Sequence, residues 1–165
     1  MGLFIFDKDG TLIQLKRNSL GIRRPAICPE DQVLLPGVYE KLVELRAGGH
    51  KVAIASNQRA ISQGLLTLEQ AEALMKNAIE KLGGVDAWRI CPFDAHARAV
   101  IRGQPNPYRL ENTCRKPQPG MLIELMAELG VPPEDSYMVG DSWRDRRAAV
   151  LAGIGFISAV KFFQY

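Results

Sequence analysis

The feature that most constrains this chain is a short apolar segment that ends in two aspartates. Residues 3–6 are all apolar, Asp7 and Asp9 follow with one residue between them, and Gly10 and Thr11 come next. An apolar run this short, bounded by a turn signal, predicts a buried strand. Successive strand residues point to opposite faces, but a turn after Asp7 lets Asp9 reach the same place. We therefore expect one edge of a sheet to carry both carboxylates.

Two carboxylates in this arrangement suit phosphoryl transfer. One can attack phosphorus and hold a divalent cation through its second oxygen, while the other gives a proton to the leaving oxygen and later takes one from water. The alternative is a hairpin in which Asp9 and Gly10 merely form the turn. Short motifs of this kind match by chance, so partners elsewhere in the chain have to decide.

Polar residues that can complete such a site follow a second predicted strand and precede a helix. Ser56 and Asn57 come directly after the mostly apolar segment 51–55, and their hydroxyl and amide groups can donate hydrogen bonds to phosphate oxygens. Arg115 and Lys116 stand just before a predicted helix, where Lys116 can act as a point charge on a phosphate and Arg115 as a fork.

A third apolar segment, residues 137–140, ends at Asp141, and Asp145 follows four residues later. Asp141 supplies the hard oxygen ligand that Mg²⁺ prefers, and Asp145 can orient a metal-bound water or Lys116. The order of these segments along the chain favours an active site over a simple hairpin.

Alternation of strands and helices predicts the fold class. Apolar spacing and end signals predict four helices, near 38–47, 67–82, 120–129 and 144–151, and two further short strands, at 88–91 and 156–160. Strands separated by helices pair in parallel through right-handed crossovers, which places their carboxyl ends on one edge. We expect an α/β fold: a three-layer, Rossmann-like parallel sheet with helices on both faces and a ligand crevice at that edge.

Size and composition fit a single enzyme domain over residues 1–165. The chain is 47% hydrophobic and 24% charged, and no apolar run is long enough to cross a membrane. The first strand begins at once, which leaves no room for a signal peptide, so we expect a cytoplasmic monomer. The net charge of +3 is mild and the arginines lack interleaved aromatic residues, so nucleic-acid binding has weak support.

Four motifs together resemble those of the haloacid dehalogenase superfamily of phosphohydrolases: Asp7-x-Asp9-Gly-Thr, Ser56-Asn-Gln, Lys116-Pro and Gly140-Asp141-x-x-x-Asp145. Within it, residues 35–38, 56–64 and 114–121 are most similar to the branch that contains the heptose bisphosphate phosphatases, histidinol phosphate phosphatases and polynucleotide 3′-phosphatases. The resemblance covers nearly the whole chain.

The resemblance implies a Mg²⁺-dependent phosphomonoester hydrolase that works through an aspartyl-phosphate. Asp7 would be the nucleophile and Asp9 the general acid and base. Mg²⁺ would be held by the Asp7 carboxylate, the Asp9 carbonyl and Asp141. The other implied positions are phosphate binding by Ser56, Asn57 and Lys116, contact with the rest of the substrate by Arg59 and Arg115, and support by Thr11 and Asp145. Electrostatics also require Mg²⁺ and Lys116, because a phosphate dianion and the Asp7 carboxylate repel each other. Near a surface the repulsion is about 4 kcal/mol for each pair of like charges at close range.

Two segments without clear periodicity, 13–34 and 92–113, are expected to form a flap over the active site and a substrate-facing loop, with no large cap domain. An open site leaves the substrate undecided. The first reading is a small sugar phosphate or related metabolite of the heptose bisphosphate or histidinol phosphate type, and the alternative is a polynucleotide 3′-phosphatase. A catalytically silent protein that binds a phosphorylated ligand is the non-enzyme alternative, and four complete motifs argue against it.

The chain departs from its apparent relatives at a zinc site. Many of those carry a structural zinc on a Cys-x-His pair and a Cys-x-Cys pair, of which Cys91 and Cys114 match two positions while Phe93 and Asn112 replace the others. Zinc needs four ligands, so we expect none here and expect the three cysteines to be reduced thiols. A rearranged zinc site would use the residues Cys28, Cys91, His96 and Cys114, whose spacing does not fit the usual patterns.

Overall fold

The protein is built on one sheet of five parallel strands, seen here in a computed structural model that describes all 165 residues. The strand order is β5-β4-β1-β8-β9, so the first strand lies at the centre. Their bounds are β1 Leu3–Phe6, β4 Lys51–Asn57, β5 Ala87–Cys91, β8 Ser136–Gly140 and β9 Gly155–Ser158. Leu3 is in register with Lys51 on one side and with Ser136 on the other.

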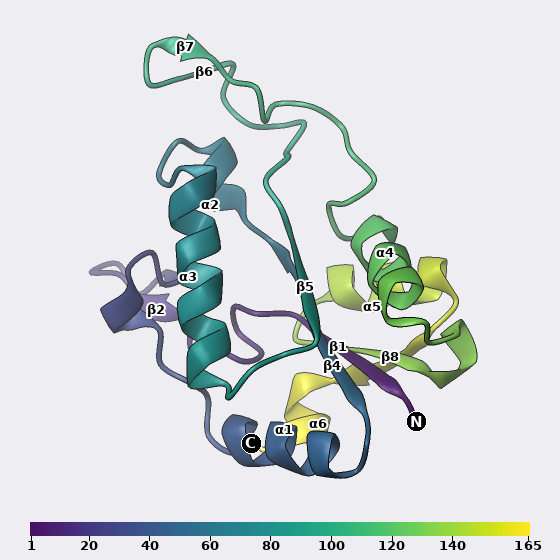
Figure 1. Cartoon of the computed structure of the whole chain (residues 1–165). Helices are drawn as coiled ribbons and strands as arrows, with labels where there is room; N and C mark the ends of the chain where they lie inside the picture. The colour runs from purple at the N-terminus through teal and green to yellow at the C-terminus, as the bar shows by residue number, and fades with distance from the viewer.

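Helices cover both faces of this sheet, as Figure 1 shows, with α3 on one side and α4 and α5 on the other. The helix bounds are α1 Val38–Ala47, α2 Arg59–Ser62, α3 Leu68–Lys81, α4 Gly120–Leu129, α5 Trp143–Ala152 and α6 Ala159–Phe163. The predicted three-layer α/β fold is therefore confirmed.

Alternation along β1 separates the two halves of the core. Leu3 and Ile5 pack with residues of α4 and α5, whereas Phe6 packs with residues of α1 and α3. All three side chains are fully buried. Burial on both faces explains why this strand is continuously apolar rather than alternating.

Local signals place the helix ends correctly. The hydroxyl of Thr67 accepts a hydrogen bond from the Gln70 backbone and the Gln70 side chain accepts one from the Thr67 backbone, which is the predicted capping box of α3. Gly130 ends α4 in the left-handed conformation, where glycine is favoured. The prediction was wrong at the last strand, which stops at Ser158 because the Ser158 side chain caps α6.

Each of the two irregular segments contains a small hairpin and neither forms a large cap. The first holds β2 Lys16–Arg17, β3 Arg23–Arg24 and the 3-10 helix η1 Pro29–Asp31, and the second holds β6 Val100–Ile101 and β7 Gln104–Pro105. A second 3-10 helix, η2, spans Pro133–Asp135. The end of the first segment is fastened to α3, because the Lys81 ammonium donates to the carbonyls of Pro29 and Gln32.

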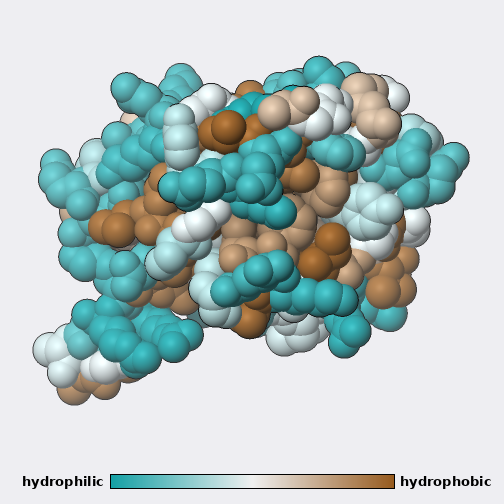
Figure 2. Space-filling model, turned by 90° about the horizontal axis from the view of Figure 1, so that it is seen from below, coloured by the Kyte–Doolittle hydropathy of each residue, from teal (hydrophilic) through white to brown (hydrophobic).

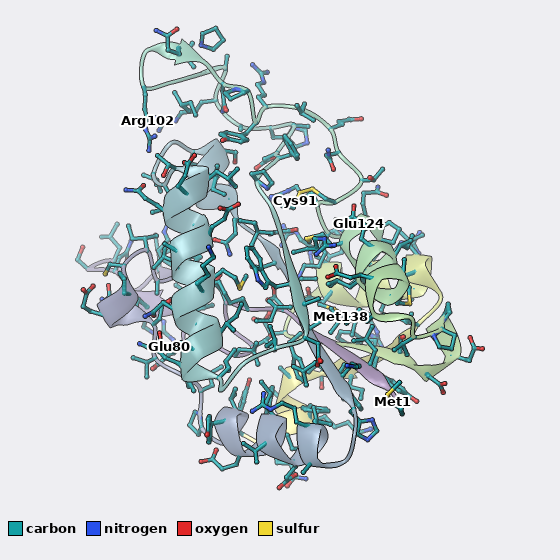
Figure 3. All side chains as sticks on the ribbon, in the orientation of Figure 1. Met1, Glu80, Cys91, Arg102, Glu124 and Met138 are labelled. Atoms are coloured by element: carbon teal, nitrogen blue, oxygen red, sulfur yellow. A yellow bond between two sulfur atoms is a disulfide. The ribbon has the colours of Figure 1, made fainter.

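The cysteines differ from the prediction. Cys91 and Cys114 form a disulfide, drawn as the yellow bond beside Cys91 in Figure 3, and only Cys28 is free. The expectation that all three are reduced thiols was therefore wrong, because the loop returns Cys114 to within 5.6 Å of Cys91 measured between Cα atoms. Neither cysteine of this pair has a thiol that could bind a metal, while the Cys28 thiol donates to Asp31. The cytoplasmic location stays a prediction.

The surface mixes polar and apolar side chains. In the view of Figure 2 hydrophobic residues are interspersed with hydrophilic ones, and a narrow projection stands out from the body at the lower left. None of the helices combines the length and the apolar character that crossing a membrane would take.

Candidate functional site

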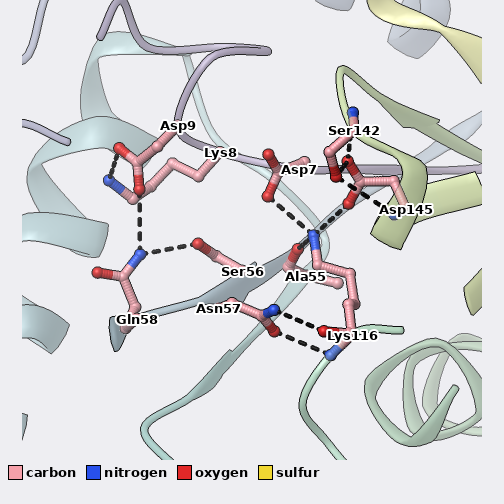
Figure 4. Close-up of polar contacts among 10 residues, drawn as sticks. All are labelled: Asp7, Lys8, Asp9, Ala55, Ser56, Asn57, Gln58, Lys116, Ser142 and Asp145. Atoms are coloured by element: carbon pink, nitrogen blue, oxygen red, sulfur yellow. Dashed lines mark hydrogen bonds and ion pairs between the residues drawn. The ribbon is translucent and has the colours of Figure 1, made fainter. Parts of the chain in front are cut away.

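The carboxyl ends of the three central strands bring the predicted residues to one place. Asp7 follows β1, Ser56 and Asn57 end β4, and Asp141 follows β8. Figure 4 shows Asp7, Ser56 and Asn57 converging with residues from two later segments, Lys116 and Asp145. Parallel strands create this arrangement, because all of them end on the same edge of the sheet.

Lys116 lies at the centre of this cluster. Its ammonium donates to Asp7 Oδ1 at 2.8 Å, to Asp145 Oδ1 at 2.7 Å and to the Ala55 carbonyl at 2.7 Å. Its side chain is only 2% exposed. All three ammonium protons are thus engaged, so a phosphate oxygen reaches Lys116 only by replacing one of these acceptors.

Asn57 fixes the backbone that carries this lysine. Its side-chain carbonyl accepts a hydrogen bond from the Lys116 backbone N–H at 3.0 Å, and its amide donates to the Lys116 carbonyl at 2.9 Å. One amide proton of Asn57 remains for another acceptor. These two hydrogen bonds join segments that are 59 residues apart in sequence.

Burial and charge shift the acid–base properties of the cluster. Burial raises the pKa of Asp7 from 3.8 to about 7; the Lys116 charge opposes this rise and the Asp145 charge adds to it. Burial also raises the pKa of Asp141, again with a contribution from Asp145. For Lys116 burial would lower the pKa, but the charges of Asp7 and Asp145 outweigh it and raise the pKa. This cluster of carboxylates therefore favours a bound cation.

Carboxylate oxygens from Asp7, Asp141 and Asp145 lie within 4.8 Å of one another, which suits a hard cation such as Mg²⁺. Asp145 is already occupied: one oxygen binds Lys116 and the other accepts from the backbone and hydroxyl of Ser142. The ligands left for a cation are Asp141 and the Asp7 oxygen that Lys116 does not hold. A Cβ added at Gly10 would collide with the Asp141 carboxylate, so the glycine, with φ +89°, keeps this space open.

Asp9 belongs to a neighbouring network that the sequence did not reveal. One of its oxygens accepts from the buried ammonium of Lys8 at 2.7 Å, and the other accepts from Gln58 Nε2 at 3.2 Å (Figure 4). Gln58 also donates to Ser56 Oγ at 2.7 Å. Because the Ser56 oxygen accepts this bond, its own proton is free for a phosphate oxygen. In the sequence, only the position of Lys8 between two aspartates could have indicated this network.

Thr11 is fully buried near the same turn. Its hydroxyl has no hydrogen-bond partner, while its carbonyl accepts from the Tyr165 hydroxyl at 3.1 Å. The sequence did not indicate any role for Tyr165. This contact ties the aspartate-bearing turn to the segment that follows α6.

A cavity of about 820 Å³ opens beside Lys116. It is lined by Arg59 and Arg115, both predicted to contact substrate, and by Trp143 and Arg144, which were not predicted. Residues 94–96 and 110–113 also line it, in agreement with a substrate-facing second loop. No residue of segment 13–34 lines this cavity, and the predicted role of that segment as a flap over the active site stays a prediction.

Comparisons with known proteins identify the family. The family model for haloacid dehalogenase-like hydrolases matches residues 20–153. A D-glycero-β-D-manno-heptose-1,7-bisphosphate 7-phosphatase of Photorhabdus laumondii is 32% identical over 130 residues, which are 76% of this chain and 66% of that protein. The Escherichia coli K12 protein of that name is 31% identical over 125 residues, 73% of this chain and 62% of that protein. The matches thus span just under two thirds of these relatives.

Among solved structures, D,D-heptose 1,7-bisphosphate phosphatase from B. bronchiseptica, complexed with magnesium and phosphate, superposes with a TM-score of 0.73. It is 29% identical, and the match covers 94% of this chain and 79% of that chain. The likeness extends over nearly all the elements described above.

Proposed function

The chain belongs to the haloacid dehalogenase-like hydrolase family, and on that premise we propose that it is a Mg²⁺-dependent phosphomonoesterase acting on a sugar phosphate of the heptose bisphosphate type. The observation that carries the proposal is the contact between Lys116 and Asp7, beside a free carboxylate from Asp141. A cation site and a buried lysine on either side of one carboxylate are what a phosphate dianion needs in order to approach an anionic nucleophile.

Asp7 is the nucleophile in this proposal. The Asp7 oxygen that gives up Lys116 to the incoming phosphate attacks phosphorus, the bond to the leaving oxygen breaks, and Asp9 supplies the proton that the leaving alkoxide needs. Asp9 then takes a proton from a water, whose oxygen attacks the aspartyl-phosphate; phosphate leaves and the Asp7 carboxylate is restored.

Asp7, Asp141 and the Asp9 carbonyl would hold Mg²⁺, which would neutralise charge on the phosphoryl oxygens. Ser56 and the remaining amide proton of Asn57 would donate to the same oxygens. Asp145 would position Lys116 and would not contact the phosphate itself, because its two oxygens already bind Lys116 and Ser142. Arg59 and Arg115 would contact the organic part of the substrate in the adjoining cavity.

The sugar phosphate assignment is supported by relatives whose names give heptose bisphosphate phosphatases. The polynucleotide 3′-phosphatase reading is the alternative, because the open cavity with its arginines could also admit a nucleic-acid end. Hydrolysis of heptose 1,7-bisphosphate, histidinol phosphate and a 3′-phosphorylated oligonucleotide at several salt concentrations separates the two. A steep loss of activity with salt for the oligonucleotide would favour the alternative.

The direct test is Asp7→Asn, assayed with p-nitrophenyl phosphate and with heptose bisphosphate in the presence of Mg²⁺. Turnover should fall by roughly 10³-fold or more, since the nucleophile is lost while the shape is kept. Asp135→Asn, an exposed aspartate in η2, is the matched control and should retain full activity. EDTA should stop the wild-type reaction and added Mg²⁺ should restore it. Retained activity in Asp7→Asn would refute the assignment.

A further inference from the structure

The hairpin of β2 and β3 carries four basic side chains on a short stretch of chain. Residues 16–24 include Lys16, Arg17, Arg23 and Arg24 and no acidic residue. In the antiparallel register Lys16 lies opposite Arg24, and Arg17 lies opposite Arg23. Like charges that face each other directly across two strands destabilise a hairpin. An arrangement that is unfavourable in the free protein needs a structural or a functional reason.

Neighbouring carboxylates compensate little of this charge. Lys16 pairs with Asp31, whereas none of the three arginines of the hairpin forms an ion pair. The Arg17 guanidinium donates instead to the Gly21 carbonyl at 3.1 Å. All four basic residues are exposed. Three positive charges therefore face the solvent from one small hairpin, and their natural complement is a surface that carries negative charge.

Two aliphatic side chains are exposed at the tip of the same hairpin. Leu20 is 80% exposed and Ile22 is 46% exposed. The turn that presents them is well ordered by hydrogen bonds, because Asn18 Oδ1 accepts from the backbone N–H of Leu20 and from that of Ile22. The Asn18 carbonyl accepts from the Gly21 N–H, and the Asn18 N–H donates to the Ile22 carbonyl. These four N–H groups are satisfied within the turn, so the tip can enter a poorly hydrated region without leaving them unpaired.

We propose that the β2–β3 hairpin docks the protein on the surface of a membrane that contains anionic lipids. The headgroups would bind the arginines, and Leu20 and Ile22 would enter the boundary between headgroups and acyl chains. Docking of this kind is peripheral, since it uses the tip of a hairpin rather than a membrane-spanning helix. A nucleic-acid strand fits the hairpin less well, because segment 13–34 contains no aromatic residue on which a base could stack.

The position of the hairpin suits such docking. In Figure 1 the strand β2 lies at the left margin of the molecule, away from the central sheet. The ion pair from Lys16 to Asp31 ties the hairpin to η1, and η1 is fastened in turn to α3 through Lys81. No residue of the hairpin lines the cavity beside Lys116, so a membrane at the hairpin leaves the cavity lining uncontacted. The inference uses only exposed residues of the hairpin and does not depend on the proposed phosphatase activity.

Sedimentation of the full chain with lipid vesicles tests the inference. Vesicles of equal parts phosphatidylglycerol and phosphatidylcholine should bind the protein roughly 10-fold or more tightly than vesicles of phosphatidylcholine alone. Binding should weaken as the salt concentration is raised to about 0.5 M, because salt screens the attraction. Equal binding to both kinds of vesicle, or binding to neither, would overturn the proposal. A single-stranded oligonucleotide that binds the hairpin while the anionic vesicles do not would also overturn it, in favour of a nucleic-acid partner.

Reversal of two charges tests the arginines. Arg23→Glu/Arg24→Glu should lower the partition coefficient on the anionic vesicles by roughly 25-fold or more, because each cation near such a surface strengthens binding by about 5-fold. The matched control, Arg147→Glu/Lys161→Glu, makes the same change in net charge at two exposed residues of α5 and α6. It should lose far less binding. An equal loss in both variants would show a general effect of net charge and would overturn the proposal.

A second variant, Leu20→Gln/Ile22→Gln, keeps every charge and tests the apolar tip. Its partition coefficient should fall by roughly 10-fold or more, because the aliphatic surface no longer leaves water on docking. The matched control is Ile123→Gln/Val150→Gln, at aliphatic residues of α4 and α5 that are 50% and 60% exposed, and it should bind as the wild type does. Circular dichroism spectra that match the wild type show that each variant is folded. Wild-type binding by Leu20→Gln/Ile22→Gln would overturn the insertion of the tip.

Discussion

Lys116 and Asp7 are 109 residues apart in sequence, yet the lysine ammonium lies 2.8 Å from the Asp7 carboxylate. Asp145 and the Ala55 carbonyl complete the same ammonium shell. Opposite charges buried together stabilise each other only when hydrogen bonds satisfy the remaining protons, and here they do. Asp7, the proposed nucleophile, is thus held in position without substrate. Its burial disfavours the charged form and raises its pKa.

The raised pKa of Asp7 predicts how the stability of the fold depends on pH. Because the pKa of Asp7 is raised from 3.8 to about 7, the folded metal-free protein keeps a proton between these pH values that the unfolded chain has released. The stabilisation that this proton gives the folded state is fully present below pH 3.8 and is lost as pH rises through about 7. Asp7→Asn removes the titration, so its free energy of unfolding relative to wild type should rise with pH, by up to about 4 kcal/mol.

Urea denaturation in EDTA at pH 4.5 and pH 8 measures this difference. Mg²⁺ provides the control, since it should stabilise the wild type at pH 8 far more than the variant. If the wild type instead gains stability over Asp7→Asn between these pH values, the buried charge is favourable and the direction of the shift is wrong.

Gly10→Ala should weaken Mg²⁺ binding. The added methyl group would collide with the Asp141 carboxylate, and the residue would also be strained at φ +89°. Gly84→Ala isolates the second effect, because Gly84 has φ +100° with nothing within 4 Å. Both variants should lose about 1 kcal/mol of stability. Only Gly10→Ala should need more Mg²⁺ for half-maximal activity, and equal Mg²⁺ requirements would exclude the collision.

Gln58→Leu should lower kcat by roughly 10- to 100-fold. The amide joins Asp9 to Ser56, so its loss frees the proposed acid and allows the serine hydroxyl to rotate. Gln63→Leu is the control, a glutamine at the end of α2 whose side chain makes no hydrogen bond. Steady-state kinetics with p-nitrophenyl phosphate would show the effect, and equal kcat values for both variants would argue against a role for the link.

Reduction of the Cys91–Cys114 disulfide should destabilise the protein by about 2–4 kcal/mol, as for other loops of this length. Cys114→Ser should have the same effect without a reductant. Cys28→Ser leaves the pair intact and should respond to dithiothreitol as the wild type does. Thermal unfolding with and without dithiothreitol makes the comparison. An unchanged melting temperature in Cys114→Ser would mean that packing alone holds this loop.

The parts that the sequence predicted are those governed by local periodicity and by strand direction. The capping box at Thr67, the bounds of α4 and the meeting of Asp7, Ser56 and Asp141 all follow from these two rules. A parallel sheet needs no knowledge of loops to place its strand ends on one edge.

The parts that it did not predict depend on contacts between distant loops. Cys91 and Cys114 are 23 residues apart in sequence and pair only because the loop between them folds back. No local sequence pattern encodes that fold. The hydrogen bond from Gln58 to Asp9 depends on the turn after β4. The placement of segment 13–34 depends on the hydrogen bond that Lys81 of α3 donates to the Gln32 carbonyl. Side-chain networks and loop docking are set by tertiary packing, where propensity has little influence.

The central position of β1 also bears on biosynthesis. Its partners β4 and β8 are made early and late, and β8 ends only at Gly140. A nascent chain therefore carries Asp7, the proposed nucleophile, before it has the neighbouring strand β8, Asp141 and Asp145. Interrupted translation products would be inert toward phosphate esters, and a split version of the protein would work only if its two fragments rebuild the middle of the sheet.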